Sequence, residues 1–378
     1  MTSVFILVDA LGWELVRDRP FLTDVLPYRR SLRTVLGFSS GAIPSILTGL
    51  LPEAHGHWNL FLYRPESSPF RWLRPLRHLP SRWINHRAVR KAVSLAGRKL
   101  SGSDGYFSIY GIPLQLLPYF DICEKHDIYR PGGLRPRPSI FDRLEQAGVP
   151  YRVYSYHRYS DREAVRASVR DLRAGAARFY FVYLAELDAF LHRQVNSPEA
   201  LEPRLAQYAE DIRRIFEAAV QRDPETAFYV FSDHGMTPIR ETFDLISLIR
   251  GLGWKEPRDY LALYDSTMAR FWFFSPQARR AIQIRLESLE CGRVLSPQDQ
   301  KALGIGFSDA RFGELIFLMR PGCLICPSYM GRTPWAGMHG FDPDDPHSSA
   351  ALLARRPPPV AVEGIWQMFD LMRHEAGL

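Results

Sequence analysis

The feature that most constrains this chain is a set of three short apolar runs, each closely followed by an aspartate. The runs are rich in Val, Phe and Tyr and cover residues 4–8, 179–184 and 227–231. Runs of this length and composition predict strands buried on both faces of a parallel sheet. The aspartates that follow them are Asp9, Asp188 and Asp233. Core packing does not explain a carboxylate after every run.

Histidines accompany these aspartates. His234 directly follows Asp233, and His192 lies four residues after Asp188. A further histidine, His339, lies among glycines in a polar stretch near the C-terminus. Open parallel sheets bind ligands just outside the carboxyl ends of their strands. Three Asp and three His side chains are enough for two divalent metal ions with about three protein ligands each. For the Asp-His pair alone, a surface turn is the alternative interpretation.

Length and composition fit one large α/β domain with an insertion, or two domains. The 378 residues are 46% hydrophobic and 24% charged, which are ordinary values for a chain with a sizeable core. No run approaches the ~20 uncharged apolar residues that span a bilayer. The N-terminus enters a predicted strand without the basic region and cleavage site of a signal peptide, so we expect a soluble, cytoplasmic protein.

The four cysteines are too few for a disulfide framework. Cys323 and Cys326 have the spacing of half a zinc site, but no second Cys or His pair stands in register with them. Two incidental thiols in a structural loop are the favoured interpretation.

A second motif lies near the N-terminus. Residues 31–36 predict a strand, and Ser39, Ser40 and Gly41 lead from it into a predicted helix. A hydroxyl at such a position suits a nucleophile, because the N–H groups and dipole of a helix N-terminus favour a phosphate dianion. A capping role for serine is the alternative, and the two roles are compatible.

Together these blocks resemble the alkaline phosphatase superfamily, and most closely its type I phosphodiesterase and nucleotide pyrophosphatase branch. They follow the family's order from residue 4 to about 342. The matching blocks are Asp9, Ser39 with residues 48–56, residues 139–148, Asp188 with His192, residues 232–236, and residues 339–342. The resemblance implies an α/β fold with a mostly parallel, alkaline-phosphatase-like central sheet, helices on both faces and an inserted cap.

Carried over by position, the resemblance implies two divalent metal ions, most often zinc, with manganese as the alternative. One ion would be held by Asp188, His192 and His339. The other would be held by Asp9, Asp233 and His234.

The resemblance also places the nucleophile nine residues before Thr48, at Ser39, with Ser40 as the runner-up. The chain departs from the family just after this position. Gly41 and Ala42 stand where the family has Pro and an Asn that helps to hold a phosphoryl oxygen. A backbone N–H, such as that of Ser40, is the expected substitute.

The function implied is hydrolysis of a small-molecule phosphodiester or nucleotide-type pyrophosphate through a phosphoseryl intermediate. A phosphomonoesterase is one alternative, and a transferase that passes a phosphoryl-linked head group to a glycan or lipid acceptor is another. A binding module on a degenerate phosphatase scaffold is the non-enzyme alternative. A sulfatase is disfavoured because neither Ser39 nor Ser40 lies in a Cys/Ser-x-Pro-Ser-Arg setting.

Residues 59–138 interrupt the α/β alternation and are rich in Arg, Trp, Pro and Tyr. We expect residues 1–58 and 139–378 to form the catalytic domain and 59–138 to form an inserted cap. Much of the net charge of +7 comes from basic residues between 64 and 99. Three interpretations remain open for them: contact with a substrate phosphate, contact with an anionic membrane surface, or a solvated basic face. No specific nucleic-acid motif is present.

The rest of the pattern predicts helices over 139–148, 162–172 and 199–219, and strands over 151–154 and 265–273. Arg270, within the last strand, is predicted to be a surface charge or a substrate contact.

Overall fold

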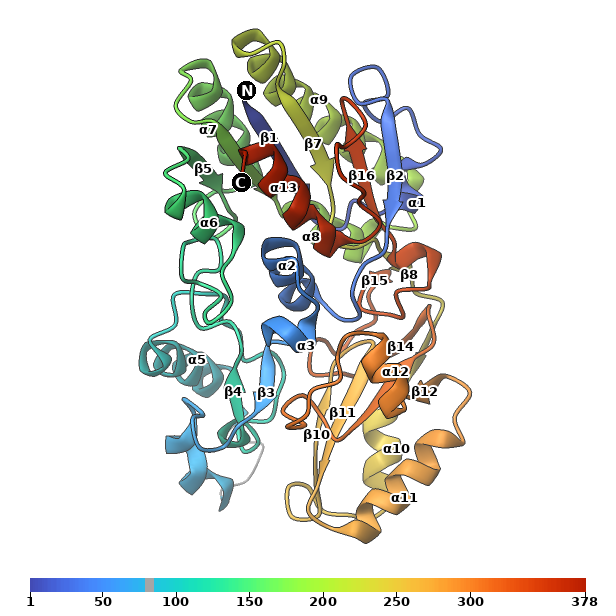
Figure 1. Cartoon of the computed structure of the whole chain (residues 1–378). Coiled ribbons are helices and arrows are strands. Elements are labelled where there is room, and N and C mark those ends of the chain that lie inside the picture. Colours follow the sequence, from blue (N-terminus) through green and yellow to red (C-terminus); the bar gives the residue numbers. More distant parts are fainter. Residues whose placement is uncertain (79–84) are drawn as a thin grey trace. The chain divides into compact units, whose positions relative to one another are not determined.

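The computed structural model describes residues 1–78 and 85–378, and the chain divides into two compact units (Figure 1). The first unit comprises residues 1–55, 128–238 and 335–378, and the second comprises 56–127 and 239–334. Most of the range expected as an inserted cap falls in the second unit, and residues 79–84 of that range lie outside the described residues. Its role as a cap stays a prediction.

The first unit is built on a six-stranded sheet with strand order β2-β16-β7-β1-β6-β5. Strands β5, β6, β1 and β7 are parallel, whereas β16 is antiparallel to both of its neighbours. This is the mostly parallel α/β sheet predicted from the sequence. The strands are β1 (Ser3–Val8), β2 (Tyr28–Leu32), β5 (Tyr151–Tyr154), β6 (Phe179–Leu184), β7 (Ala227–Phe231) and β16 (Ala350–Ala354).

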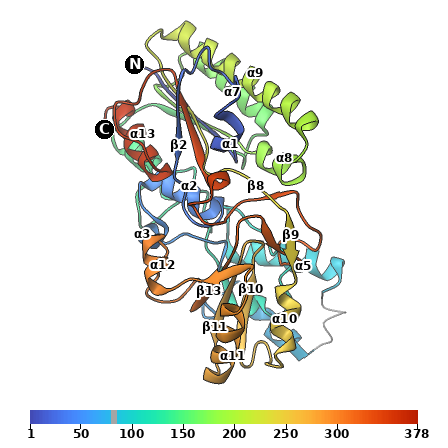
Figure 2. The same ribbon diagram turned by 90° about the vertical axis from the view of Figure 1, so that its right-hand side faces the viewer.

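Helices cover both faces of this sheet, as Figure 2 shows in the turned view. Side chains of β1 alternate between two cores: Val4, Ile6 and Val8 pack with α1, α7, α8 and α9, while Phe5 and Leu7 pack with α2, α6 and α13. The helices are α1 (Trp13–Val16), α2 (Ser39–Thr48), α3 (Pro52–His55), α6 (Ile140–Gln146), α7 (Asp161–Arg173), α8 (Glu186–Gln194), α9 (Pro198–Arg222) and α13 (Met368–Ala376). The minor elements are β8 (Thr237–Pro238), β15 (Gly337–Met338), η3 (Pro346–Ser348) and η4 (Ile365–Gln367).

The predicted elements of this unit are confirmed with one shift. The helix expected over 139–148 begins after a capping box at Ser139. The strand expected over 31–36 is instead β2, which ends at Leu32 because it follows its antiparallel partner β16. Beyond it the chain turns, and the hydroxyl of Thr34 donates to the carbonyl oxygen of Asp233 over 2.6 Å.

The second unit contains a four-stranded antiparallel sheet with strand order β10-β11-β13-β12, together with two-stranded pairs. Its strands are β3 (Phe61–Tyr63), β4 (Phe120–Ile122), β9 (Glu241–Phe243), β10 (Tyr260–Tyr264), β11 (Met268–Phe273), β12 (Gly292–Val294), β13 (Leu315–Met319) and β14 (Cys323–Ile325). Its helices are η1 (Arg71–His78), α5 (Arg87–Ser101), η2 (Leu117–Tyr119), α10 (Leu245–Gly251), α11 (Pro276–Glu287) and α12 (Pro297–Ala302). Within the described residues, no helix is long and apolar enough to cross a membrane.

Arg270 on β11 is a buried residue, so the expectation of a surface charge is wrong. Its side chain is 1% exposed, and its Nε lies 2.9 Å from Oδ2 of Asp265. Its Nη1 donates to the carbonyl oxygen of Phe61 over 2.9 Å. The guanidinium also lies 5.9 Å and 6.0 Å from the ring centroids of Trp58 and Trp272. These contacts satisfy a charge that would otherwise be costly to bury.

We therefore expect Arg270→Met to destabilise the second unit by about 3 kcal/mol, because it leaves a carboxylate and a carbonyl without their donor. Chemical denaturation measures this loss. The control is Arg258→Met, which removes an ion pair to Asp259 from an arginine that is 75% exposed and should cost much less, because solvent screens an exposed pair. An equal loss of unfolding free energy in both variants would show that the buried cluster stabilises the unit no more than the exposed ion pair does.

Candidate active site

The carboxyl ends of three neighbouring strands bring the predicted aspartates together. In the sheet, Val8 of β1 lies opposite Leu184 of β6, and Leu7 lies opposite Phe231 of β7. Asp9 directly follows β1, Asp233 follows β7 after one residue, and Asp188 lies in the first turn of α8 after β6. All three carboxylates therefore gather at one edge of the sheet, as the parallel arrangement requires.

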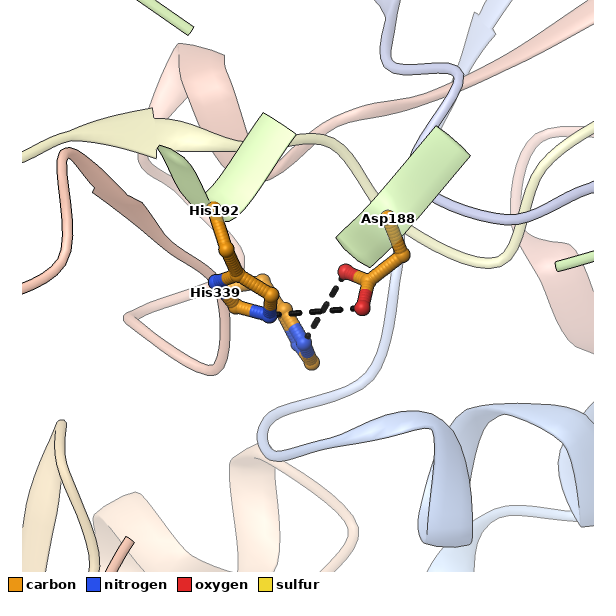
Figure 3. Close-up of side chains that lie close together, drawn as sticks. All are labelled: Asp188, His192 and His339. Atoms are coloured by element: carbon orange, nitrogen blue, oxygen red, sulfur yellow. Dashed lines mark ion pairs between the residues drawn. The ribbon is translucent and has the colours of Figure 1, made fainter. Parts of the chain in front are cut away.

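Asp188 forms one Asp-His group with His192 and His339 (Figure 3). His192 lies one helical turn after Asp188 on α8, and its Nε2 is 3.3 Å from Oδ2 of Asp188. Nε2 of His339 is 3.4 Å from the other oxygen, Oδ1. The two imidazoles thus approach both oxygens of one carboxylate. Their nitrogens and the carboxylate all lie within 4.8 Å of one another, which suits a single metal ion.

His234 forms the second group. Its Nε2 lies 3.5 Å from Oδ1 of Asp9 and 3.2 Å from Oδ2 of Asp233. Asp9, Asp188 and His234 also offer ligand atoms within 4.8 Å of one another, so Asp188 reaches both groups. The rings of His234 and His339 stack with centroids 3.8 Å apart and planes inclined by 10°. The two groups are therefore adjacent parts of one site.

Local backbone structure places the two histidines beside each other. The antiparallel pairing of β15 with β8 brings the residues before His339 alongside those after His234. Gly12 and Gly235 permit a close approach of the loops that follow β1 and β7. A Cβ on Gly12 would lie 2.5 Å from Cα of Gly235, and one on Gly235 would lie 2.2 Å from the carbonyl oxygen of His347. These loops therefore require glycine.

Hydrogen bonds fix which nitrogen of two histidines faces the carboxylates. Nδ1 of His192 lies 2.9 Å from the carbonyl oxygen of Gly337, and Nδ1 of His234 lies 2.9 Å from that of Gly235. A carbonyl can only accept, so Nδ1 carries the hydrogen in each ring. In the neutral imidazole the lone pair is then on Nε2, the atom that points into the site.

The buried oxygens indicate that cations belong here. Among the described residues, Asp9 Oδ1, Asp188 Oδ1 and Asp233 Oδ2 are buried without a hydrogen-bond partner, and no Lys or Arg forms an ion pair with these carboxylates. Buried charge without compensation is strongly unfavourable. Divalent metal ions would supply both the missing charge and the missing contacts, so the donor set fits a two-metal site.

The electrostatics of the site point the same way. Burial raises the pKa of Asp9 well above its usual value, and the neighbouring Asp233 and Asp188 raise it further, against the hydrogen bond from Tyr183. Burial lowers the pKa of His339 well below its usual value, and His234 lowers it further. Burial alone would raise the pKa of Asp188, but His192 and the other two imidazoles lower it overall. A neutral His339 beside an ionised Asp188 is the state in which both donate electron pairs to a metal.

Ser39 is the first residue of α2, and its hydroxyl reaches this site. Its Oγ lies 3.0 Å from Nε2 of His234. The helix begins with Phe38 as its N-cap, without a side-chain capping bond, so Ser39 does not act as the cap. Ser40 is the next residue of the same turn and is half-buried like Ser39. The structure therefore brings Ser39 and all six predicted Asp and His residues into one site of the first unit.

Two supporting residues were not found from the sequence. Tyr183, at the end of β6, is buried and donates its hydroxyl to Oδ2 of Asp9, which turns Oδ1 toward His234. Thr34 holds the backbone at Asp233. The signal for Tyr183 is a phenol inside a fully buried strand, where its hydroxyl must find a partner.

A model of the type I phosphodiesterase / nucleotide pyrophosphatase family matches residues 4–342. The chain belongs to this family. The recognition made from the sequence is thereby confirmed, and with it membership of a family of metal-dependent phosphoric ester hydrolases. A comparison with curated proteins gave no significant match.

Solved structures share the family's fold at low identity. Human ectonucleotide pyrophosphatase/phosphodiesterase 5 matches with a TM-score of 0.70 and 12% identity, over 100% of this chain and 95% of that one. An inactive variant of the murine protein in complex with AMP matches at 0.67 and 14%, with the same coverage. Phosphonoacetate hydrolase from Sinorhizobium meliloti 1021, in complex with phosphonoformate, matches at 0.68 and 14%, over 100% and 96%. One fold thus holds different ligands in these proteins, so the fold alone does not identify a substrate.

We expect Tyr183→Phe to lower the affinity for zinc by about 10- to 100-fold, because Asp9 loses the hydrogen bond that orients it. Competition with a chromogenic chelator measures the affinity. The matched control is Tyr154→Phe, which removes another phenol hydroxyl in the same sheet, 2.8 Å from Asp171 and outside the site. Equal zinc affinities in the two variants would contradict the role of Tyr183.

Proposed function

We propose that this protein hydrolyses small-molecule phosphodiesters or nucleotide-type pyrophosphates, with Ser39 as the nucleophile. One observation carries the proposal. The hydroxyl of Ser39 stands at the N-terminus of α2 and lies 3.0 Å from His234, within a site of three carboxylates and three imidazoles. The match to the family model supports a phosphoric ester as substrate.

Asp188, His192 and His339 would hold one divalent ion, and Asp9, Asp233 and His234 the other, with zinc as the expected metal. When bound, such ions lower the pKa of a coordinated hydroxyl and offset the charge of a transferring phosphoryl group. The contact of Asp188 with both histidine groups supports a site in which the two ions are close together.

The chain's own residues account for the covalent steps. Ser39 Oγ, having lost its proton to solvent, attacks phosphorus. An O–P bond forms to Ser39 while the bond from phosphorus to the leaving oxygen breaks, and the leaving oxygen takes up a proton from solvent. Water then attacks the phosphoserine, breaks the bond to Ser39 and restores its hydroxyl. The positive end of the helix dipole lies at the start of α2, so this end of the helix favours a phosphoryl oxygen. This compensates for Ala42, which stands where the family has an Asn.

We expect Ser39→Ala to lower turnover of bis-p-nitrophenyl phosphate at least about a thousandfold, because it removes the attacking atom. The zinc-loaded protein is assayed on this diester beside p-nitrophenyl phosphate, and metal content is measured for each variant. Ser40→Ala is the control, with activity retained within about tenfold. Preference for the diester is the expected result.

Other outcomes would redirect the proposal. Loss of activity in Ser40→Ala but not in Ser39→Ala would overturn the choice of nucleophile. Preference for the monoester would make the protein a phosphomonoesterase. Inactivity on both esters with two metals bound would favour the transferase, to be tested by adding glycan and lipid acceptors. A purified protein that binds no metal would favour the degenerate binding module.

A further inference from the structure

Helix α5 is an exposed, purely cationic helix in the second unit. It contains Arg and Lys residues but no Asp or Glu, and of its fifteen residues only Val93 and Gly97 are buried. The same bias holds around it, since residues 71–101 include no acidic residue. Most surface helices alternate charges of both signs. A helix whose charged residues are all cations and which buries so few residues therefore has a surface that its own unit does not cover.

The way α5 packs defines which face is turned outward. A Cβ on Gly97 would lie 2.4 Å from Cε1 of Phe70 and 3.2 Å from Cζ of Phe107, so the backbone of α5 lies against these two rings. On the same side, Arg90 donates to the carbonyl oxygens of Ile112, over 2.8 Å, and of Tyr110. By helical spacing the opposite side presents Leu95 at its centre, flanked by Lys91, Arg98, Lys99 and the small Ala88 and Ala92.

Large apolar side chains are exposed on α5. Leu95 and Leu100 of α5 are each 64% exposed. By helical spacing Leu100 lies about 140° around the helix from Leu95, and the small Ala92 and Ala96 lie between them. Exposed apolar side chains that gather among cations are a sign of an interaction surface, whereas single ones are not.

The cations on this face have no acidic partners. Among the described residues, no Asp or Glu forms an ion pair with Arg87, Lys91, Arg98 or Lys99. Elsewhere in the same unit, exposed arginines do pair, as Arg279 does with Glu314 over 3.3 Å and Arg320 with Glu241 over 2.5 Å. The positive field of α5 is therefore available to an external anionic partner.

We propose that α5, through Leu95, Leu100 and its unpaired cations, binds an anionic membrane surface. Leucine side chains enter the boundary between head groups and acyl chains, while lysine and arginine reach the anionic head groups. A nucleic acid would use the cations but leave Leu95 and Leu100 in water. A second copy of the chain would bring two cationic faces together. This inference is independent of the proposed hydrolysis.

The test is co-sedimentation of the full chain with vesicles of phosphatidylcholine alone and of phosphatidylcholine with phosphatidylglycerol. We expect binding to the anionic vesicles, little to the neutral ones, and weaker binding at high salt. Leu95→Gln/Leu100→Gln should weaken binding about tenfold, because the apolar contacts are lost. Lys91→Gln/Lys99→Gln should weaken it about fivefold for each cation removed.

Matched controls lie in the same unit. Ile284→Gln removes an apolar side chain that is 57% exposed on α11, and Lys301→Gln removes a cation from α12, and both should bind as the wild type does. Equal binding by the leucine variant and the wild type would overturn the proposal, as would no binding to either vesicle. If the protein bound single-stranded RNA more tightly than anionic vesicles, the face would be assigned to nucleic acid instead. A dimer that is lost in the leucine variant would assign it to a second copy of the chain. A raised KM of the lysine variant for a soluble diester would assign the face to substrate binding instead.

Discussion

The structure depends on three carboxylates that gather at one edge of a sheet, two of them buried and the third partly buried. Asp9 and Asp233 are 6% and 0% exposed, and Asp188 lies between the imidazoles of His192 and His339. Charges taken out of water without compensation destabilise a fold by several kcal/mol each. The phenol of Tyr183 donates a hydrogen bond to Asp9, but it carries no positive charge. The fold therefore requires cations at this edge of the sheet, which is also the candidate active site.

The parallel sheet meets this requirement geometrically. Strands β1, β6 and β7 all end at the same edge, so residues distant in the sequence converge without any long excursion of the chain. The remaining candidate ligand, His339, directly follows β15 and is positioned by the short pairing of β15 with β8. The start of α2 adds a hydroxyl and a helix N-terminus to the same edge. The candidate metal ligands and the proposed nucleophile thus lie on neighbouring parts of one framework.

Much of this was predictable, because strand burial and the position of a carboxylate after each strand are local properties of the sequence. The runs at 4–8 and 227–231 lie within the observed strands, and the fold class and family are confirmed. The groups that an individual side chain contacts could not be predicted as well from the sequence. Arg270 looks like a surface charge in the sequence, and only the assembled second unit shows the carboxylate and carbonyl that bury it. The end of β2 at Leu32 likewise depends on pairing with β16, which is remote in sequence.

The most direct test of the central claim is native mass spectrometry of the chain after chelation and again after zinc is restored, with thermal unfolding followed in parallel. We predict two zinc ions per chain, a rise in the unfolding temperature on loading because the ions bind only the folded state, and a loss of bound zinc in Asp188→Asn. A chain that remains free of metal, and unfolds at the same temperature with and without zinc, would show that protonation rather than metal neutralises the buried carboxylates.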